Sequence, residues 1–150
     1  MRIDAVEGEL LAPEITILAR TLPDPAARER YLALRDAVQD GDVGDDRLEA
    51  LGTLLEISLE SGRIRHLYGA DGEQTLVKLF RRTPTGRARS AATQEVSESL
   101  SALHGQIIED VAVSTVGPGS YSLTIDTDRC QLSLRVDRAG VRIENVAVGI

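Results

Sequence analysis

The densest group of chemically capable side chains in this sequence is basic. Its members are Lys78, Arg81, Arg82, Arg87 and Arg89. Guanidinium groups bind phosphate and carboxylate through paired N–H donors. The segment 83–89 leads into an expected helix, whose free N–H groups and positive N-terminal end favour the same anions. The four arginines therefore predict an anion-binding site.

The alternative interpretation of these arginines is internal neutralisation. Residues 1–62 hold six Arg and fourteen acids, a net charge of −8. Residues 63–90 hold six Arg and one Lys against two acids, a net charge of +5, and residues 91–150 carry a net charge of −4. The basic segment would then balance the acidic one within the same molecule. Both interpretations stay open at the level of sequence.

The same charges bear on which anion could bind. The whole chain has a formal net charge of −7, so most of its surface would repel duplex nucleic acid. Aromatic residues make up only 3% of the sequence, which leaves few platforms on which single-stranded bases could stack. We therefore expect no nucleic-acid partner, and a small anion or an acidic peptide is the better ligand for the arginines.

His66 and Tyr68 are the residues best suited to acid–base chemistry. They alternate with Ile64 as in a β-strand, so the three side chains would share one face and could line a pocket. The alternative is that His66 is a half-buried structural residue. No second histidine or cysteine lies at metal-ligand spacing from it.

Other candidates for chemistry fail on spacing. The acidic loop 40–46 puts Asp45 where a calcium-binding loop needs glycine. Cys130 alternates with Leu132 and Leu134, which predicts a buried thiol of low reactivity. Phosphate-loop, dinucleotide-binding and nucleophile-elbow motifs are absent. We therefore predict no metal, no cofactor and no catalytic residue.

Helical patterning precedes Gly62. Asp24-Pro25 provides an N-cap and a first-turn proline for a helix that ends at Gly41. A second helix over 45–62 buries a leucine stripe, so the two form a helical hairpin. Residues 13–22 fit a helix or a strand, and helix is favoured.

After Gly62 the apolar period changes to two. Arg63–Tyr68 and Thr75–Arg82 flank a glycine-containing linker and predict a β-hairpin. A further helix is expected from Ser90 to Gly105. Four strands then form an antiparallel meander, with a bulge after Glu144. The expected strand segments are 107–116, 121–126, 130–137 and 141–148.

This order of elements predicts an α+β fold. We expect one domain over 1–150, with a helical part at 1–62 and a sheet-rich part at 63–150. A chain of this length buries enough surface to fold without disulfides or metals. The single cysteine and the acidic first residues predict a cytoplasmic protein, and no apolar run is long enough to cross a membrane.

The function predicted from these features is binding rather than catalysis. The first hypothesis is a small acidic adaptor or chaperone-like module that binds another protein and forms a homodimer. Dimerisation is expected through the terminal strand Val141–Val148, in which either Val146 and Val148 or the earlier pair, Val141 and Ile143, would be poorly covered in a monomer. The second hypothesis is a pocket protein that binds or transforms a small anionic ligand through the arginines of segment 81–89, with His66 and Tyr68 in the pocket.

Overall fold

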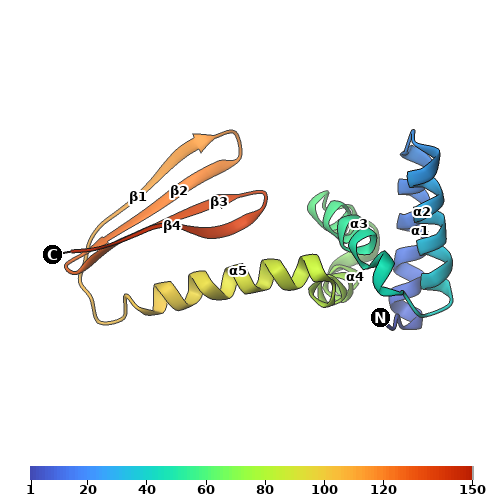
Figure 1. Ribbon diagram of the computed structural model, residues 1–150, viewed down its shortest axis with the longest axis horizontal. Helices are drawn as coiled ribbons and strands as arrows, with labels where there is room; N and C mark the ends of the chain where they lie inside the picture. The colour runs from blue at the N-terminus through green and yellow to red at the C-terminus, as the bar shows by residue number, and fades with distance from the viewer. Residues whose placement is uncertain (150) are drawn as a thin grey trace. The chain divides into compact units, whose positions relative to one another are not determined.

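The computed structural model describes residues 1–149 (Figure 1). The chain divides into two compact units, Met1–Arg87 and Ala88–Ile150. The helices are α1 (Ala5–Thr21), α2 (Pro25–Gln39), the 3-10 turn η1 (Asp45–Arg47), α3 (Leu48–Glu60), α4 (Arg63–Arg82) and α5 (Pro84–Ser101). The strands are β1 (Ile108–Gly117), β2 (Ser120–Thr127), β3 (Cys130–Asp137) and β4 (Gly140–Val148). Helices followed by an antiparallel meander confirm the predicted α+β class.

The first two helices begin where side chains cap them. At α1 the Asp4 carboxylate accepts from the Glu7 N–H at 2.8 Å, and the Glu7 carboxylate accepts from the Asp4 N–H at 3.0 Å. Pro13 lies inside this helix, so the helix favoured over 13–22 is confirmed but is longer than expected. At α2 the predicted cap is confirmed, because the Asp24 carboxylate accepts from the backbone N–H groups of Ala26 and Ala27, with Pro25 in the first turn.

The first unit has a large apolar core formed by all four of its helices. The leucine stripe predicted on the second helix is confirmed, and Leu51 and Leu55 of α3 are fully buried. α1 packs against α2 and α4, and α3 packs against α4. The fully buried large side chains of this unit are Leu11, Ile15, Leu34, Val38, Val43, Leu51, Leu54, Leu55, Ile64, Leu76 and Leu79.

The predicted β-hairpin over 63–82 is wrong, because this segment forms helix α4. Its apolar residues also fit a helical spacing, with Ile64 and Leu76 buried on one side and Tyr68 between them. The alternation over the first six residues is short, and packing of the longer helical stripe into the core decides the outcome. The change from helix to strand therefore falls between Ser101 and Ile108 rather than at Gly62.

Two glycines in α4 explain why the segment resembles a turn. Gly69 has φ +70° and ψ −171°, which interrupts the helix at a single residue. Gly72 is buried, and a Cβ there would lie 2.5 Å from the Tyr68 Cβ. Gly69 thus makes a kink, and Gly72 makes room for the tyrosine beside it.

Helix α5 begins earlier than predicted. Thr83 accepts from the Gly86 N–H at 3.1 Å and is followed by Pro84 in the first turn, so the helix starts there and not at Ser90. A Cβ on Gly86 would lie 1.9 Å from the Phe80 carbonyl oxygen. This close approach allows α5 to start directly after the last turn of α4.

The four-stranded meander is confirmed, with strands in the order β1-β2-β3-β4 (Figure 1). Directly opposed residues in antiparallel strands point to the same face. Val113, Leu123, Leu134 and Ile143 form one such row across the sheet. Two flanking rows consist of Val111, Ile125, Leu132 and Val146, and of Thr115, Tyr121, Val136 and Val141. One face of the sheet is therefore almost entirely apolar.

The bulge predicted after Glu144 is confirmed. The register of β3 with β4 shifts between Ser133 and Leu134, which pair with Asn145 and Ile143 and leave Glu144 unpaired. This extra residue keeps Val146 on the apolar face despite the change in sequence alternation. The bulge therefore preserves one apolar surface along the whole of β4.

Candidate functional site

The apolar face of the meander is covered only at its centre. Val96 of α5 packs with Leu132 and Leu134 of β3, and these three are the buried apolar residues that the structure describes in the second unit. Leu123, Val141 and Ile143 pack against this cluster and are half-buried, whereas other large side chains of this face stay exposed. We call this set the open face: Val111, Val113, Tyr121, Val136, Val146 and Val148, which are between 41% and 75% exposed.

Acidic residues lie at one end of the sheet. Asp110 of β1 is directly opposite Asp126 of β2, on the polar face, and Glu109 precedes this pair. Like charges directly opposite each other are destabilising in a sheet. A cation or a basic side chain near this end would relieve the repulsion. The open face is therefore apolar, and the acids cluster at one end of the sheet, with the opposed pair on the polar face.

The structure brings three of the four predicted arginines together. Arg81 and Arg82 end α4, and Arg87 lies in the first turns of α5. All three line a pocket of about 460 Å³ that also includes Met1, Asp45 and Leu48. The predicted loop before the helix is wrong, because the segment 84–89 is already helical. The arginines converge because two helix ends meet at Thr83.

The arginines around this pocket differ in their partners. Arg82 donates to the buried carboxylate of Glu7 at 2.8 Å and to the backbone carbonyl of Arg2, so it holds the start of α1 to the end of α4. Arg81 and Arg87 are exposed and have no acidic side-chain partner among residues 1–149. Arg89 belongs to the second unit.

His66 and Tyr68 do not share a face. In a helix, residues two apart point to different sides, so the pairing expected from a strand is lost. His66 is exposed, whereas Tyr68 is half-buried and its hydroxyl lies 3.4 Å from Glu14 Oε1. Burial and the neighbouring carboxylate raise the pKa of the Tyr68 phenol above 10.0.

The residue that sequence reasoning missed here is Glu14. Its side chain is buried on α1 and accepts from the Arg63 Nε at 3.1 Å. A carboxylate directly before a core isoleucine gives no signal on its own, because its partners come from α4. This cluster of Glu14, Arg63 and Tyr68 ties α1 to α4, and its groups are fully engaged with one another.

Cys130 lies on the same face as Leu132, as predicted, but it is half-buried rather than enclosed. Its Sγ lies 3.4 Å from Gln106 Oε1, and its N–H donates to the Thr127 hydroxyl at 2.9 Å. The Asp128 carboxylate accepts from the Ile107 N–H at 2.9 Å. These contacts shape the turn between β2 and β3 and anchor the segment before β1.

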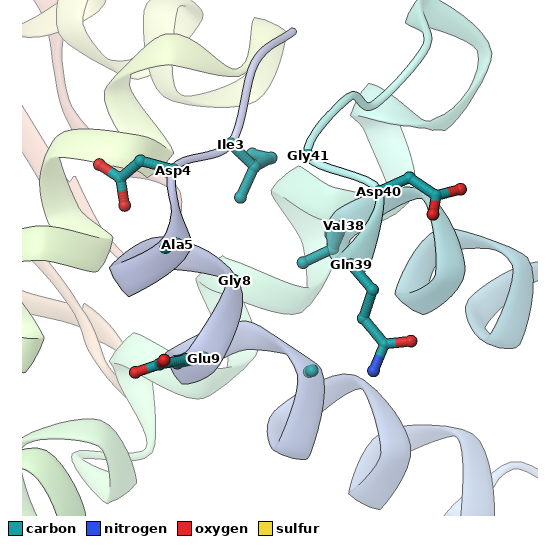
Figure 2. A pocket seen from close by; sticks show the side chains of 10 residues that line it. Ile3, Asp4, Ala5, Gly8, Glu9, Val38, Gln39, Asp40 and Gly41 are labelled. Carbon is teal, nitrogen blue, oxygen red and sulfur yellow. The ribbon is translucent and has the colours of Figure 1, made fainter.

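A second hollow, of about 510 Å³, lies between the start of α1 and the end of α2 (Figure 2). Its acidic side chains are Asp4, Glu9 and Asp40, and Figure 2 shows Asp4 and Asp40 pointing in opposite directions. Asp4 is already used as the cap of α1. The hollow therefore lacks a converging set of groups that could act on a ligand.

Within residues 1–149, no group of three or more His, Cys, Asp and Glu side chains is placed to hold a metal ion. None of the helices described in the structure combines the length and apolar character needed to cross a membrane. Comparisons with protein-family models, with curated proteins and with solved structures find no match to this chain.

Proposed function

We propose that this protein is a small acidic adaptor or chaperone-like module that binds another protein and has no catalytic activity. The observation that carries the proposal is the open face, part of an apolar sheet surface of which only Leu132 and Leu134 of β3 are fully buried. Contiguous exposed apolar surface on a folded protein marks interaction sites. Burying it against a partner would remove these valines and Tyr121 from water.

The charge of the second unit indicates the chemistry of the partner. Residues 88–150 hold five arginines and eight acids. Glu109, Asp110 and Asp126 gather at one end of the sheet, with Asp110 and Asp126 on the polar face opposite the open face. An apolar segment flanked by lysine or arginine would satisfy both features. We therefore propose a basic amphipathic segment of another protein as the occupant of the open face.

A pair of model peptides tests this proposal. A fluorescent Lys/Leu amphipathic helix should bind with a rise in anisotropy, and a Glu/Leu peptide with the same leucine spacing should bind at least tenfold more weakly. Tyr121→Ser with Val136→Ser should reduce affinity for the Lys/Leu peptide at least tenfold. Ile57→Ser removes an exposed apolar side chain of the first unit and serves as the control. Equal binding of both peptides, or equal loss in the control, would contradict the proposal.

A second candidate function is favoured by the pocket that Arg81, Arg82 and Arg87 line. Two arginines without acidic partners, beside a third, form a site suited to phosphate or a carboxylate ligand. Sulfate should then raise the melting temperature more than chloride at equal ionic strength. Arg81→Gln with Arg87→Gln should remove the difference, and Arg138→Gln should keep it. If sulfate still raised the melting temperature of the double variant more than chloride does, the sulfate would bind at another site and this candidate function would be contradicted.

Self-association as a homodimer belongs to the first proposal. The second unit buries few apolar residues, and the meander ends in two open edges, β1 and β4. A strand edge presents unpaired N–H and C=O groups that another strand can satisfy. A second copy of the chain has the same open edges and can therefore supply such a strand.

A further inference from the structure

The two edges of the meander differ in how well they are protected. At β4 the bulge at Glu144 interrupts the regular backbone pattern, and the charged side chains of Arg142 and Glu144 lie beside it. Bulges and charges on an edge strand are devices that oppose pairing with another strand. The terminal strand, which the sequence favours for dimerisation, is therefore the protected edge.

Over its central segment, 111–115, which reads Val-Ala-Val-Ser-Thr, the β1 edge has neither a bulge nor a charge. Its register with β2 is irregular only at the two ends of the strand, around Glu109 and Val116. The segment has no charge and no proline, and the register with β2 is regular from Asp110 to Thr115. Every residue from 108 to 116 is exposed, and Val113 is 70% exposed. A regular, uncharged and exposed edge of this kind is suited to adding a strand.

We infer that β1 of one copy pairs with β1 of a second copy in antiparallel orientation, which joins two meanders into one continuous sheet. This inference rests on the proposed self-association and names the surface that performs it. The occupant is a second copy because the edge is complementary to itself. An antiparallel pair related by a two-fold axis satisfies both edges at once.

The register follows from which residues share a face. A two-fold axis at Val113, perpendicular to the sheet, places Val111 opposite Thr115 of the other copy and Ala112 opposite Ser114. Apolar-face residues then oppose apolar-face residues. Asp110 falls opposite Val116, so the acids of the two copies do not face each other. This register therefore brings no two like charges opposite each other within the paired segment.

Pairing in this way extends the open face without covering it. Val111 and Val113 gain valine and threonine neighbours from the second copy, and the two apolar faces lie on the same side of the joined sheet. The pairing adds to the apolar packing of a unit in which Val96, Leu132 and Leu134 are the buried apolar residues that the structure describes. Protein binding on the open face and strand pairing at the edge are therefore compatible.

Sedimentation of two matched variants tests the inference. The wild-type chain at about a hundred micromolar should sediment as a dimer of about twice 16.2 kDa. Val113→Lys places a charge at the centre of the β1 edge and should raise the dimer dissociation constant at least a hundredfold. Val146→Lys places the same charge on the same face at the β4 edge and should leave the dissociation constant within about threefold. Circular dichroism reports whether each variant is folded.

Cross-linking keeps the inference testable if Val113→Lys fails to fold. In a Cys130→Ser background, a mixture of the Ala112→Cys and Ser114→Cys variants should form an intermolecular disulfide, because opposed Cα atoms in antiparallel strands lie within disulfide range. Each variant alone should cross-link more slowly. Both residues are on the polar face, so two copies packed through their open faces would not cross-link them.

The outcomes separate this inference from the proposal beneath it. A wild-type chain that stays monomeric at about a hundred micromolar overturns both self-association and the β1 pairing. A dimer that Val113→Lys leaves intact, or that Val146→Lys dissociates, overturns the β1 pairing and keeps self-association. A dimer that Val113→Lys dissociates, but whose mixed cysteines do not cross-link, overturns edge pairing in favour of contact between the open faces.

Discussion

The two units of this chain solve the problem of burying apolar surface to different degrees. In Met1–Arg87, four helices surround a core in which fourteen apolar residues are buried. In the second unit, one helix contributes Val96 to a core that includes Leu132 and Leu134. A helical unit can close its core on all sides, whereas a single sheet needs a second layer over one entire face.

Because the second unit buries less of its apolar surface, it is the unit that leaves apolar surface for a partner to cover. A mostly apolar sheet face with one covering helix is incomplete as a layer, and the open face is the part that remains. The first unit also ties its helices with buried charge, through Glu7 with Arg82 and Glu14 with Arg63. Under the proposed function, the first unit is the scaffold and the second carries the interaction surface.

The largest effect should come from the core of the first unit. Leu55→Ala removes a fully buried side chain of α3 and should lower the free energy of unfolding by about 2–5 kcal/mol, through lost burial and the cavity left behind. Val148→Ala, at a 75% exposed position of the open face, should change it by less than about 0.5 kcal/mol. Urea unfolding followed by circular dichroism measures both. Similar values for the two variants would contradict the contrast between the units.

Removing the buried carboxylate of the first unit should have the next largest effect. Glu14→Ala leaves Arg63 and Tyr68 without their shared partner and should cost about 1.5–3 kcal/mol of unfolding free energy. The pKa of Tyr68 should also fall toward 10.0, since the carboxylate raises it. Glu9→Ala, at an exposed position of the same helix, should change neither quantity. An unchanged Tyr68 pKa in the Glu14→Ala variant would contradict the contact between the phenol and this carboxylate.

The kinked helix α4 can be tested at Gly72. A methyl group there would meet the Tyr68 side chain, so Gly72→Ala should destabilise the protein by about 1–3 kcal/mol although alanine favours helix. Tyr68→Ala should not relieve this loss, because alanine keeps the Cβ that the new methyl group meets, whereas Gly72→Ala combined with Tyr68→Gly should cost less than the sum of the two single changes. If Gly72→Ala stabilised the protein as an ordinary helix substitution would, the close packing within α4 would be wrong.

The smallest expected effect is the pH response of the β4 bulge. The hydrogen bond from Arg135 lowers the pKa of Glu144 below its ordinary 4.5, and Ser122 donates to the same carboxylate. A lowered pKa adds stability above the ordinary value, and this stability is lost as the pH falls through the folded value. Glu144→Gln should therefore flatten stability between pH 5 and 3, measured by urea unfolding. A wild-type slope retained in the variant would point to other carboxylates.

The sequence predicted the fold best where one local signal acted alone. Asp24-Pro25 marked the start of α2, and the alternating residues of β3 marked its apolar face. Thr83-Pro84 carries the same capping signal for α5, but the expectation of a strand before it concealed that signal. The prediction of a hairpin over 63–82 was wrong because the six alternating residues 63–68 fit the spacing of a strand as well as that of a helix. Only packing against α1 and α3 decides between the two.

The candidate sites were harder to predict because they depend on contacts between elements. Three of the four arginines do converge, although through two helix ends rather than a loop. The partner of Arg82 is Glu7, which lies at the other end of the first unit's sequence. The open face could not be predicted, because the spacing of apolar residues does not show how much of the sheet α5 covers. The protected state of β4 followed from the predicted bulge, but its consequence for dimerisation did not.

Hydrogen exchange at two concentrations tests the central claim most directly, because it reports on β1 and β4 in the unaltered chain. We predict that the amides of 111–115 that point away from β2 are protected at about a hundred micromolar and lose protection on dilution to about one micromolar, while the amides of β4 exchange at the same rate in both samples. Equal exchange of β1 at the two concentrations, or a change confined to β4, would contradict the account.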